Sequence, residues 1–421
     1  MASRASFARS AVAGFASLLV GCGDPSQRSD DHGALDVPST TETRESDIAA
    51  VDTAGETPPV DAEAAEVVPV EVVAGCDACA LGCCGEACCA LDPSQAAIDS
   101  LGDGQGTFTI GAALAFDTGR ECAGDTALGA CERVAIREGH VVCVCRVDVL
   151  EVTGRLEVTG SEALVVLART GITIEGTLDV SGVGTRSGPG GGWSYDALRE
   201  GRAGGKGGSF ASVGGGGDPV LGAEDLEPLT AGCSGQATSA EPTLGGGRGG
   251  ALQLSAGEHV TVRGSVLAHG GGGGGGVLAG GGGGGSGGAI LIEAPRVAII
   301  GVVAAHGGGG GGAAGDGGAG TPGEDGRHDR AALGGAGRDG SGCEEHGFLS
   351  GGDGGAGAFG EAEAMSGELG ASEYRCGPDE AWVGGGGGGG GLGRIRIRSL
   401  TPCECTGLIA PTPRLDAADI R

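Results

Sequence analysis

The sequence predicts an all-β fold made of stacked parallel strands. The first observation is a repeated phrase: Ala251–His269 and Ala289–His306 share one order of alternating apolar residues, and each runs into a stretch of glycines. The second is that each copy holds three short runs of period-2 alternation, the pattern of β-strands, with turn residues between them. Three strands in a repeat of about 22 residues is one coil of a solenoid, so we expect a right-handed parallel β-helix.

Weaker copies of the phrase extend this array. Ala163–Gly182 and Arg394–Ile409 align with it, and Leu150–Gly160 matches Ile172–Gly182 one coil earlier. Stacked branched side chains bury a narrow aliphatic core between parallel sheets. Alternation predicts that the inward side chains are Leu156, Val158, Leu164, Val166, Ile172, Ile174, Leu178, Val180, Leu252, Leu254, Val260, Val262, Ile290, Ile292, Ile395, Ile397, Cys403 and Cys405.

Three excursions, 182–250, 270–288 and 307–393, hold most of the 98 glycines. They leave and re-enter the solenoid at one corner, so we expect them to lie against one of its sides. This composition without a period is typical of disorder, and flexible insertions are one interpretation. Extended polyglycine can instead satisfy its backbone groups from neighbouring segments. We expect closely packed, polyglycine II-like segments, with Gly315–Trp382 looser.

Residues 1–21 have the pattern of a signal peptide. Arg4 and Arg9 precede the apolar run Ala11–Val20, which is too short to span a bilayer. The run ends in Leu-Val-Gly-Cys, a bacterial lipobox that predicts lipidation of Cys22. Acyl chains on that cysteine would hold the protein on a membrane. The alternative is a plain signal peptide followed by a chance cysteine.

Residues 22–75 are expected to form a disordered acidic tether. Gly23–Gly75 carries 13 acidic residues against Arg28 and Arg44 and cannot bury enough apolar surface to fold. The whole chain has a formal net charge of −29 and one lysine, which excludes nucleic acid as an expected partner. The solenoid is expected over 106–410, followed by an irregular tail at 411–421.

A cysteine-rich segment at 76–105 precedes the solenoid. Cys76-x-x-Cys79 alone would indicate zinc or redox chemistry. Beyond the inner membrane thiols oxidise, and a loop-rich segment without a core needs covalent links, so we expect disulfides. Fifteen cysteines remain beside Cys22, so at least one lacks an internal partner. The disulfide candidates are Cys76, Cys79, Cys83, Cys84, Cys88, Cys89, Cys122, Cys131, Cys143, Cys145, Cys343, Cys376, Cys403 and Cys405.

Glu157 and Asp179 are the only catalytic candidates of the predicted solenoid. They lie one coil apart on the outward face, within roughly 5 Å by strand spacing. Such a pair could bind Ca²⁺ or act as the acid and nucleophile of a glycosidase. Leu267 and Ala304 replace them in the next coils, and acidic residues are common on solvated faces.

Two other groups could hold metal ions. His269 and His306 occupy equivalent corners, where they could bind a metal together or simply pack at the start of a glycine run. Asp316, Asp325 and Asp353 lie in glycine tracts, as in calcium-binding nonapeptide repeats, but without the regular spacing of those repeats. We therefore expect no metal or cofactor.

The chain resembles the glycine-rich surface lipoproteins of Gram-negative bacteria. The matching stretches are the lipobox at Cys22, Gly288-Ala-Ile-Leu-Ile-Glu-Ala and Gly391-Leu-Gly-Arg-Ile-Arg-Ile, and the likeness covers roughly 140–400. It implies an envelope location and supplies no catalytic residues. The chain is also similar to phage adhesins built from packed polyglycine helices, which would imply binding by variable tips.

These features together predict a lipid-anchored cell-envelope protein with a structural or adhesive role and no catalysis. Its expected partners are the membrane, through the acyl anchor, and a polysaccharide or another envelope component. Gly23 rather than an aspartate follows Cys22, which by the enterobacterial sorting rule predicts the outer membrane. The alternative is a polysaccharide-active β-helix enzyme that uses the outward carboxylates.

Overall fold

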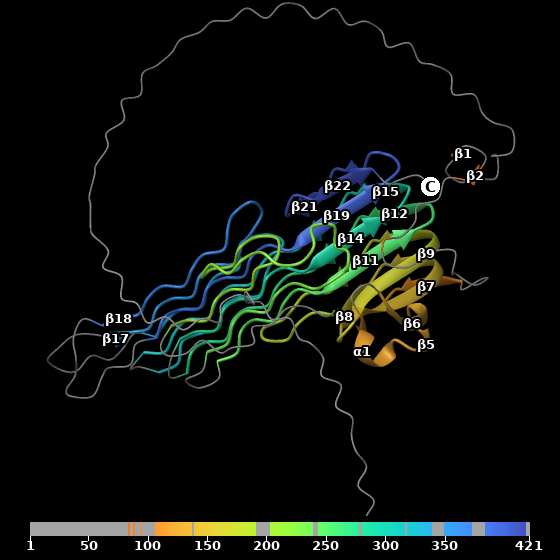
Figure 1. The fold of residues 1–421 in the computed structure, drawn as a ribbon. Helices are drawn as coiled ribbons and strands as arrows, with labels where there is room; N and C mark the ends of the chain where they lie inside the picture. Colours follow the sequence, from red (N-terminus) through yellow and green to blue (C-terminus); the bar gives the residue numbers. More distant parts are fainter. Residues whose placement is uncertain are drawn as a thin grey trace, which may run out of the picture.

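The computed structural model describes residues 83–84, 87–88, 94, 106–136, 139–190, 203–238, 243–277, 280–315, 318–338, 349–372 and 384–417. Over these residues the protein is all-β, with one short helix, α1 (Thr118–Glu121). Figure 1 shows two regions, a stack of strands and a set of long glycine-rich segments that run on from one side of it. The predicted signal peptide and tether, 1–75, lie outside the described residues.

The strands of the stack form two sheets. The smaller sheet is wholly parallel, in the order β21-β16-β13-β10-β8-β4. Its strands are β4 (Leu114–Asp117), β8 (Arg155–Thr159), β10 (Thr177–Asp179), β13 (Ser265–Leu267), β16 (Val302–Ala304) and β21 (Leu408–Ala410).

The larger sheet has twelve strands, parallel except around the hairpin β5–β6. It contains β3 (Thr107–Ile110), β5 (Gly124–Thr126), β6 (Gly129–Ala135), β7 (Val141–Val152), β9 (Ala163–Ile174), β11 (Ala251–Ala256), β12 (His259–Val262), β14 (Ala289–Glu293), β15 (Arg296–Ile299), β19 (Arg394–Ser399), β20 (Glu404–Cys405) and β22 (Arg414–Ala417). Two short antiparallel pairs lie apart: β1 (Cys83–Cys84) with β2 (Ala87–Cys88), and β17 (Leu349–Ser350) with β18 (Ala371–Ser372).

The register of the sheets follows the repeated phrase. Leu252 on β11 pairs with Ile290 on β14, which in turn pairs with Ile395 on β19. The first two runs of the phrase are separate strands in the later copies. In β7 and β9 they form one continuous strand of 12 residues, because neither a proline nor a Gly-Glu turn interrupts them. The prediction of three strands per repeat is therefore wrong for these two copies.

The inward side chains predicted from alternation are confirmed. They form one aliphatic cluster between the sheets, in which Ile290 and Ile292 are fully buried. Cys403 and Cys405 are partly buried and pack against the end of that cluster. Since adjacent copies contact each other through equivalent residues, the core is continuous along the stack.

Part of the outer face of the larger sheet, on β7, β9, β11 and β14, is also buried, in keeping with the expectation that the excursions lie against one side of the strands. The segment from Phe210 to Ala231, part of the first excursion, packs on it and forms a second apolar cluster with Val165 and Leu291. Leu291 needed this cover, whereas Ile300 stays 53% exposed. Burial on both faces is typical of central parallel strands.

The burial of Glu293 on this face was not predicted from the sequence. Its outward position on β14 predicts a solvated side chain, but its exposed fraction is 0%. Its carboxylate accepts hydrogen bonds from Gln253 and Ser255 at 2.8 Å each, and it forms an ion pair with Arg398 at 2.6 Å. The hydroxyl of Ser94 donates to it as well, at 2.6 Å. A buried charge is tolerated here because it is paired and hydrogen-bonded.

We use the name glycine block for the described residues of the three excursions, 182–250, 270–288 and 307–393. In Figure 1 most of its segments run side by side and extend away from the strands. They therefore continue the stack at one end of the strands as well as covering one of its faces. The segment 280–288 exchanges backbone hydrogen bonds of 2.7–2.9 Å with six other segments, at Gly208, Cys233, Gly246, Gly271, Gly308 and Gly388.

The hydrogen bonds of the glycine block recur every third residue. This is the repeat of an extended helix with three residues per turn, whose backbone groups point away from its own axis. Each segment can thus form hydrogen bonds to neighbours in several directions, whereas a strand in a sheet bonds only to the strands on its two sides. One pair of segments shows this spacing. The amides of Gly270, Gly273 and Gly276 donate, in that order, to the carbonyl oxygens of His306, Gly309 and Gly312, with a donor–acceptor distance of 2.9 Å in each bond.

The expectation that Gly315–Trp382 is looser is wrong for its described part. A Cβ atom added at Gly351 or Gly354 would meet backbone closer than 3.0 Å, a separation that real Cβ atoms essentially never show. The amide of Gly354 donates to the carbonyl oxygen of Gly335 at 2.8 Å. The described charged residues of this excursion are exposed or half-buried, whereas its glycines stay in close contact.

The chain does not become irregular after Cys405. Leu408–Ala410 forms β21, which pairs with β16, and Arg414–Ala417 forms β22, which pairs with β19. The expected irregular tail is therefore wrong over 414–417, where Leu415 continues the inward row behind Ile397. Proline at 411 and 413 shapes the turn between the two strands without ending the stack.

Candidate functional site

The described cysteines form three disulfides. Cys122–Cys143 and Cys131–Cys145 attach α1 and β6 to β7, and Cys403–Cys405 lies at the opposite end of the stack. The sulfurs of Cys131, Cys143 and Cys145 lie close enough together to hold a metal ion, but all three are already joined in disulfides.

Cys233 is the cysteine that the disulfide candidates omitted, and it is buried with a free thiol. A free thiol agrees with the odd number of cysteines, fifteen, that remain when Cys22 is set aside. The side chains of Cys76, Cys79, Cys83, Cys84, Cys88, Cys89, Cys343 and Cys376 lie outside the described residues.

Glu157 and Asp179 are in register on neighbouring strands, as the repeat predicts. Each carboxylate, however, is bound to an arginine: Asp179 to Arg155 at 2.6 Å, and Glu157 to Arg186 at 3.1 Å. Asp179 also accepts the amide hydrogen of Ser181 at 3.0 Å. Both carboxylates therefore have protein partners and are held by contacts within the fold.

His269 and His306 stack on each other, with ring centroids 5.4 Å apart. The amide of His306 donates to Nδ1 of His269 at 3.0 Å, so His269 carries its ring proton on Nε2. His306 donates from Nδ1 to the carbonyl oxygen of Arg327 at 2.6 Å, so only its Nε2 keeps a free lone pair. Two histidines with one free lone pair between them cannot bind a metal jointly, and the pair is better explained by packing.

Burial lowers the pKa of His269 to about 3, with a smaller effect from the neighbouring His306. Burial also lowers the pKa of His306. Both rings are therefore neutral at physiological pH, where the glycine block meets the strands. Their Nε2 atoms make no hydrogen bond within the described part of the chain.

The aspartates of the glycine tracts bind backbone amides. One oxygen of Asp325 accepts from Gly184 at 2.6 Å and from Gly272 at 2.9 Å, and Asp353 accepts from Gly337 at 2.6 Å. Asp325 therefore joins segments of all three excursions, whereas Asp353 joins two segments of the third, and both carboxylates hold the glycine block together. Asp316 lies outside the described residues.

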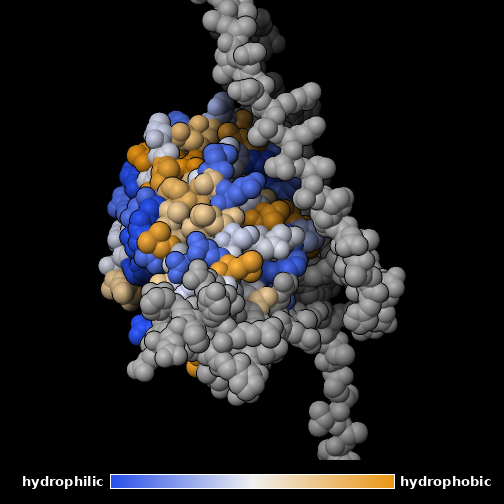
Figure 2. Space-filling view, turned by 90° about the vertical axis from the view of Figure 1, so that its left-hand side faces the viewer, coloured by the Kyte–Doolittle hydropathy of each residue, from blue (hydrophilic) through white to orange (hydrophobic). Residues whose placement is uncertain are grey.

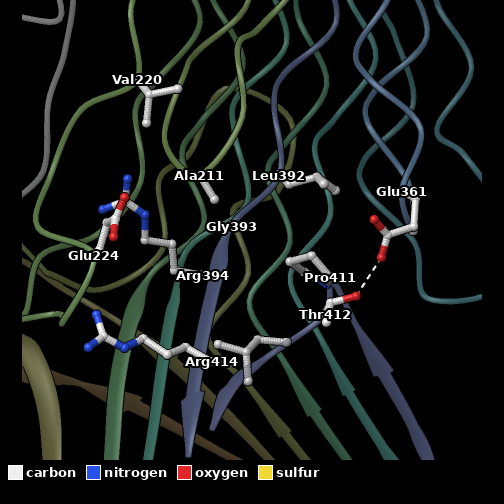
Figure 3. A pocket seen from close by; sticks show the side chains of 12 residues that line it. Ala211, Val220, Glu224, Glu361, Leu392, Gly393, Arg394, Pro411, Thr412 and Arg414 are labelled. Atoms are coloured by element: carbon white, nitrogen blue, oxygen red, sulfur yellow. Dashed lines mark hydrogen bonds between the residues drawn. The ribbon is translucent and has the colours of Figure 1, made fainter. Parts of the chain in front are cut away.

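A cavity of about 380 Å³ opens where the glycine block, β19 and the last turn of the chain meet. Figure 3 shows Arg394, Arg414 and Glu224 on one side of it and Glu361 with Thr412 on the other. Between them lie aliphatic side chains, which include Val220, Leu392 and Pro411. The cavity, called the junction pocket below, combines both signs of charge with an apolar lining.

The polar groups of the junction pocket are held in place by the surrounding structure. Arg394 donates to the carbonyl oxygens of Gly222 at 2.7 Å and Phe210 at 3.0 Å, and its guanidinium lies 4.8 Å from the centre of the Phe210 ring. On the opposite side the hydroxyl of Thr412 donates to Glu361. Burial lowers the pKa of Arg394, and the nearby Glu224 opposes this effect. Such fixed groups suit a ligand that both donates and accepts hydrogen bonds.

A second, open groove of about 540 Å³ lies on the outer face of β12, β15 and β20. His259, Arg296 and Glu404 line it together with Thr261 and Thr401. His259 and Arg296 are paired in register, whereas Glu404 is one strand further along, in register with Ala298. The groove thus carries mixed charges on a sheet face that no glycine segment covers among the described residues.

Neither the junction pocket nor the open groove was predicted from the sequence. The junction pocket takes residues from the first excursion, the third excursion, β19 and the turn before β22, and no spacing in the sequence links these segments. The only available signal was the run Arg394-Ile-Arg-Ile-Arg, which places basic side chains on alternate positions of a predicted strand in a strongly acidic chain.

Figure 2 shows the face at the free end of the glycine block, where polar and apolar residues are interspersed without a single large hydrophobic patch. No protein-family model, curated protein or solved structure matches the chain. Among the described residues there is no helix of the length and apolar character needed to cross a bilayer.

Proposed function

We propose that this chain is a lipid-anchored envelope protein that binds a saccharide and catalyses no reaction. In this proposal Cys22 carries the acyl anchor, residues 23–75 form the tether, and the described region is a right-handed parallel β-helix with packed polyglycine II-like segments. The outer membrane is the proposed location. The glycine-rich surface lipoproteins described above remain the resemblance that motivates it.

The observation that carries the binding role is the junction pocket. Its volume of about 380 Å³ lies in the usual range of ligand pockets, about 300–1,000 Å³. Two guanidinium groups and two carboxylates leave no net charge, which disfavours a simple anion or cation. Sugar hydroxyls donate and accept hydrogen bonds, and the C–H face of a sugar ring packs on aliphatic groups such as Leu392 and Pro411.

The contacts of the two carboxylates considered for catalysis also favour a binding role. A glycosidase needs two carboxyl groups that face the bond to be broken. Asp179 contacts Arg155 at 2.6 Å, and Glu157 contacts Arg186 at 3.1 Å. These contacts favour a structural role for both carboxylates over the alternative of a polysaccharide-active enzyme.

The anchor is tested by Cys22→Ser. We expect this variant to lose acyl labelling and to leave the membrane fraction for the soluble fraction, while the wild-type chain stays with the membrane. Gly23→Ser serves as the matched control, because it changes the next residue and keeps the cysteine. A Cys22→Ser chain that still labels and still sediments with membranes contradicts the anchor.

The binding role is tested with the full chain carrying Cys22→Ser and an array of oligosaccharides from outer-membrane and extracellular polysaccharides. Glu361→Gln should weaken binding of any retained sugar by about 10- to 100-fold, since a hydrogen bond to a charged group contributes about 1.5–3 kcal/mol. Glu404→Gln, in the open groove, should leave it unchanged. If Glu404→Gln weakens binding and Glu361→Gln does not, the saccharide site lies in the open groove. If no oligosaccharide binds, the proposal is contradicted.

A further inference from the structure

The two ends of the stacked core differ in how they are capped. At the N-terminal end α1 and the hairpin β5–β6 cover the first strands, and Leu128 of that hairpin is fully buried. Two disulfides, Cys122–Cys143 and Cys131–Cys145, attach this cover to β7. Stacked repeats need such a cap, because the last layer otherwise leaves its apolar side uncovered.

The C-terminal end has no comparable cover in the described part of the chain. β20, β21 and β22 each pair with one strand of the preceding layer, and no described strand pairs with their other edges. Leu415 is 60% exposed, although Ile397, the residue behind it in the same row, is 1% exposed. Figure 1 shows β21 and β22 at the opposite end of the stack from β5, β6 and α1.

A free strand edge of this kind is a template for another strand. It presents unpaired N–H and C=O groups, and at this end of the stack it also presents exposed apolar side chains, Leu415 on β22 and Leu408 on β21. Natural proteins usually protect such edges with short strands, charged side chains, bulges or a covering segment. β22 is four residues long and carries Arg414 and Asp416, so it disfavours partner strands whose charges do not match. No described strand pairs with its outer edge, which is available to a strand of complementary charge.

The sequence of β22 is self-complementary when it pairs with itself in the antiparallel direction. With Leu415 opposite Leu415 of a second copy, Arg414 stands opposite Asp416 of that copy, and Asp416 stands opposite its Arg414. Opposite charges across an antiparallel pair stabilise it by about 0.2–1 kcal/mol each. Arg414 and Asp416 already lie on one face of the strand, where they form an ion pair at 3.0 Å.

We propose that two copies of this chain associate through their C-terminal ends, with β22 of each pairing antiparallel to β22 of the other around a two-fold axis at Leu415. The larger sheet then continues from one copy into the next, and each copy supplies the cap that the other lacks. Such a contact uses the same surface on both copies and closes at two, as in most homodimers. It requires neither the lipid anchor nor a saccharide, so it goes beyond the function proposed above.

Charge reversal on β22 tests this pairing, using the full chain with Cys22→Ser. With β22 unchanged, the chain should sediment at twice its own mass, which is 40.2 kDa for all 421 residues. Arg414→Glu alone places an acidic group opposite each Asp416, and Asp416→Arg alone places a basic group opposite each Arg414, so each variant should sediment as a monomer. An equimolar mixture of the two restores opposite charges at every position and should form dimers again.

Asp416 also binds Arg396 at 2.6 Å, so the Asp416→Arg variant could disturb β22 itself. Leu415→Asp provides the second measurement: this side chain is mostly exposed, the change should leave the melting temperature of the monomer unchanged, and it should abolish the dimer. A wild-type chain that stays monomeric, whether another segment covers the edge or nothing does, overturns the proposal. Dimers that persist in all three variants also overturn it, because they must use another surface.

Discussion

The aliphatic stack and the glycine block solve the same packing problem with opposite means. In the stack, side chains such as Ile290 and Ile292 fill the space between two sheets, and the backbone bonds only along each sheet. In the polyglycine segments of the glycine block, such as Gly270–Gly276 and Gly307–Gly312, there are no side chains, and the backbone itself fills the space and bonds in several directions. The comparison shows that close packing needs complementary surfaces and does not need large side chains.

This difference predicts that substitutions of opposite kinds destabilise the two regions. The stack should be weakened when atoms are removed, because a cavity remains. The glycine block should be weakened when atoms are added, because there is no room for them. The three predictions below use this contrast and run from the largest expected effect to the smallest.

Removing atoms from the stack should have the largest effect. Ile292→Ala leaves a cavity beside fully buried neighbours and should lower the free energy of unfolding by about 2–5 kcal/mol in urea denaturation. Ile300→Ala is the matched control: the same change in the same repeat, at a side chain that is 53% exposed, should alter stability by about 0.5 kcal/mol or less. Equal losses in the two variants would mean that the alternation does not define the core.

Adding one methyl group to the glycine block should have the next largest effect. At Gly273 the new Cβ would lie closer than 3.0 Å to the carbonyl oxygen of Gly282, whereas at Gly274 its nearest neighbour, the carbonyl oxygen of Leu244, is 3.0 Å away. Gly273→Ala should therefore cost about 1–3 kcal/mol, as overpacking does. Gly274→Ala, one residue along, should cost clearly less.

The two glycine variants are compared by thermal melts of the full chain. If both raise the melting temperature slightly, the segments behave as flexible loops whose unfolded state has been restricted. That outcome would remove the contrast between the two regions. A larger loss at Gly274 than at Gly273 would contradict the packing described for this segment.

The boundary between the two regions should give the smallest effect, and it should depend on pH. The folded pKa of His269, about 3, is below the ordinary value of 6.5, so the unfolded chain binds a proton more readily between these values. Stability should fall as the pH drops below 6.5, by about 1 to 2 kcal/mol between pH 7 and pH 5. His306 and His328 lower the pKa of His269 further, and Asp329 raises it.

Urea denaturation at the two pH values measures this effect. His269→Gln keeps an oxygen that can accept the amide hydrogen of His306 and has no proton to gain, so its stability should change less over this range. The comparison uses the pH dependence of each chain, which is independent of any constant loss caused by the substitution. An identical pH dependence in the two chains would show that His269 is not buried in neutral form.

Much of the stack could be predicted from the sequence, because its information is local. Alternation assigns Leu252 and Leu254 to the inside, and the repeated phrase aligns them with Ile290 and Ile292 before any coordinates are known. The same logic placed Glu157 beside Asp179. It failed at Glu293, because alternation distinguishes the two faces of a strand but does not say whether another segment covers the outer one.

The arrangement within the glycine block was decided by the tertiary structure alone. A run of glycines has no side-chain pattern, so nothing in it says that Gly285 bonds to Gly271 or that Asp325 joins Gly184 to Gly272. For the same reason the junction pocket, which needs Glu224, Glu361 and Arg394 in one place, has no signature in the sequence. The sequence by itself determined the inward rows of the core and the register of the repeated strands, since these depend on spacing along the chain. The contacts between excursions depend on which distant backbone segments meet, and only the folded chain decides that.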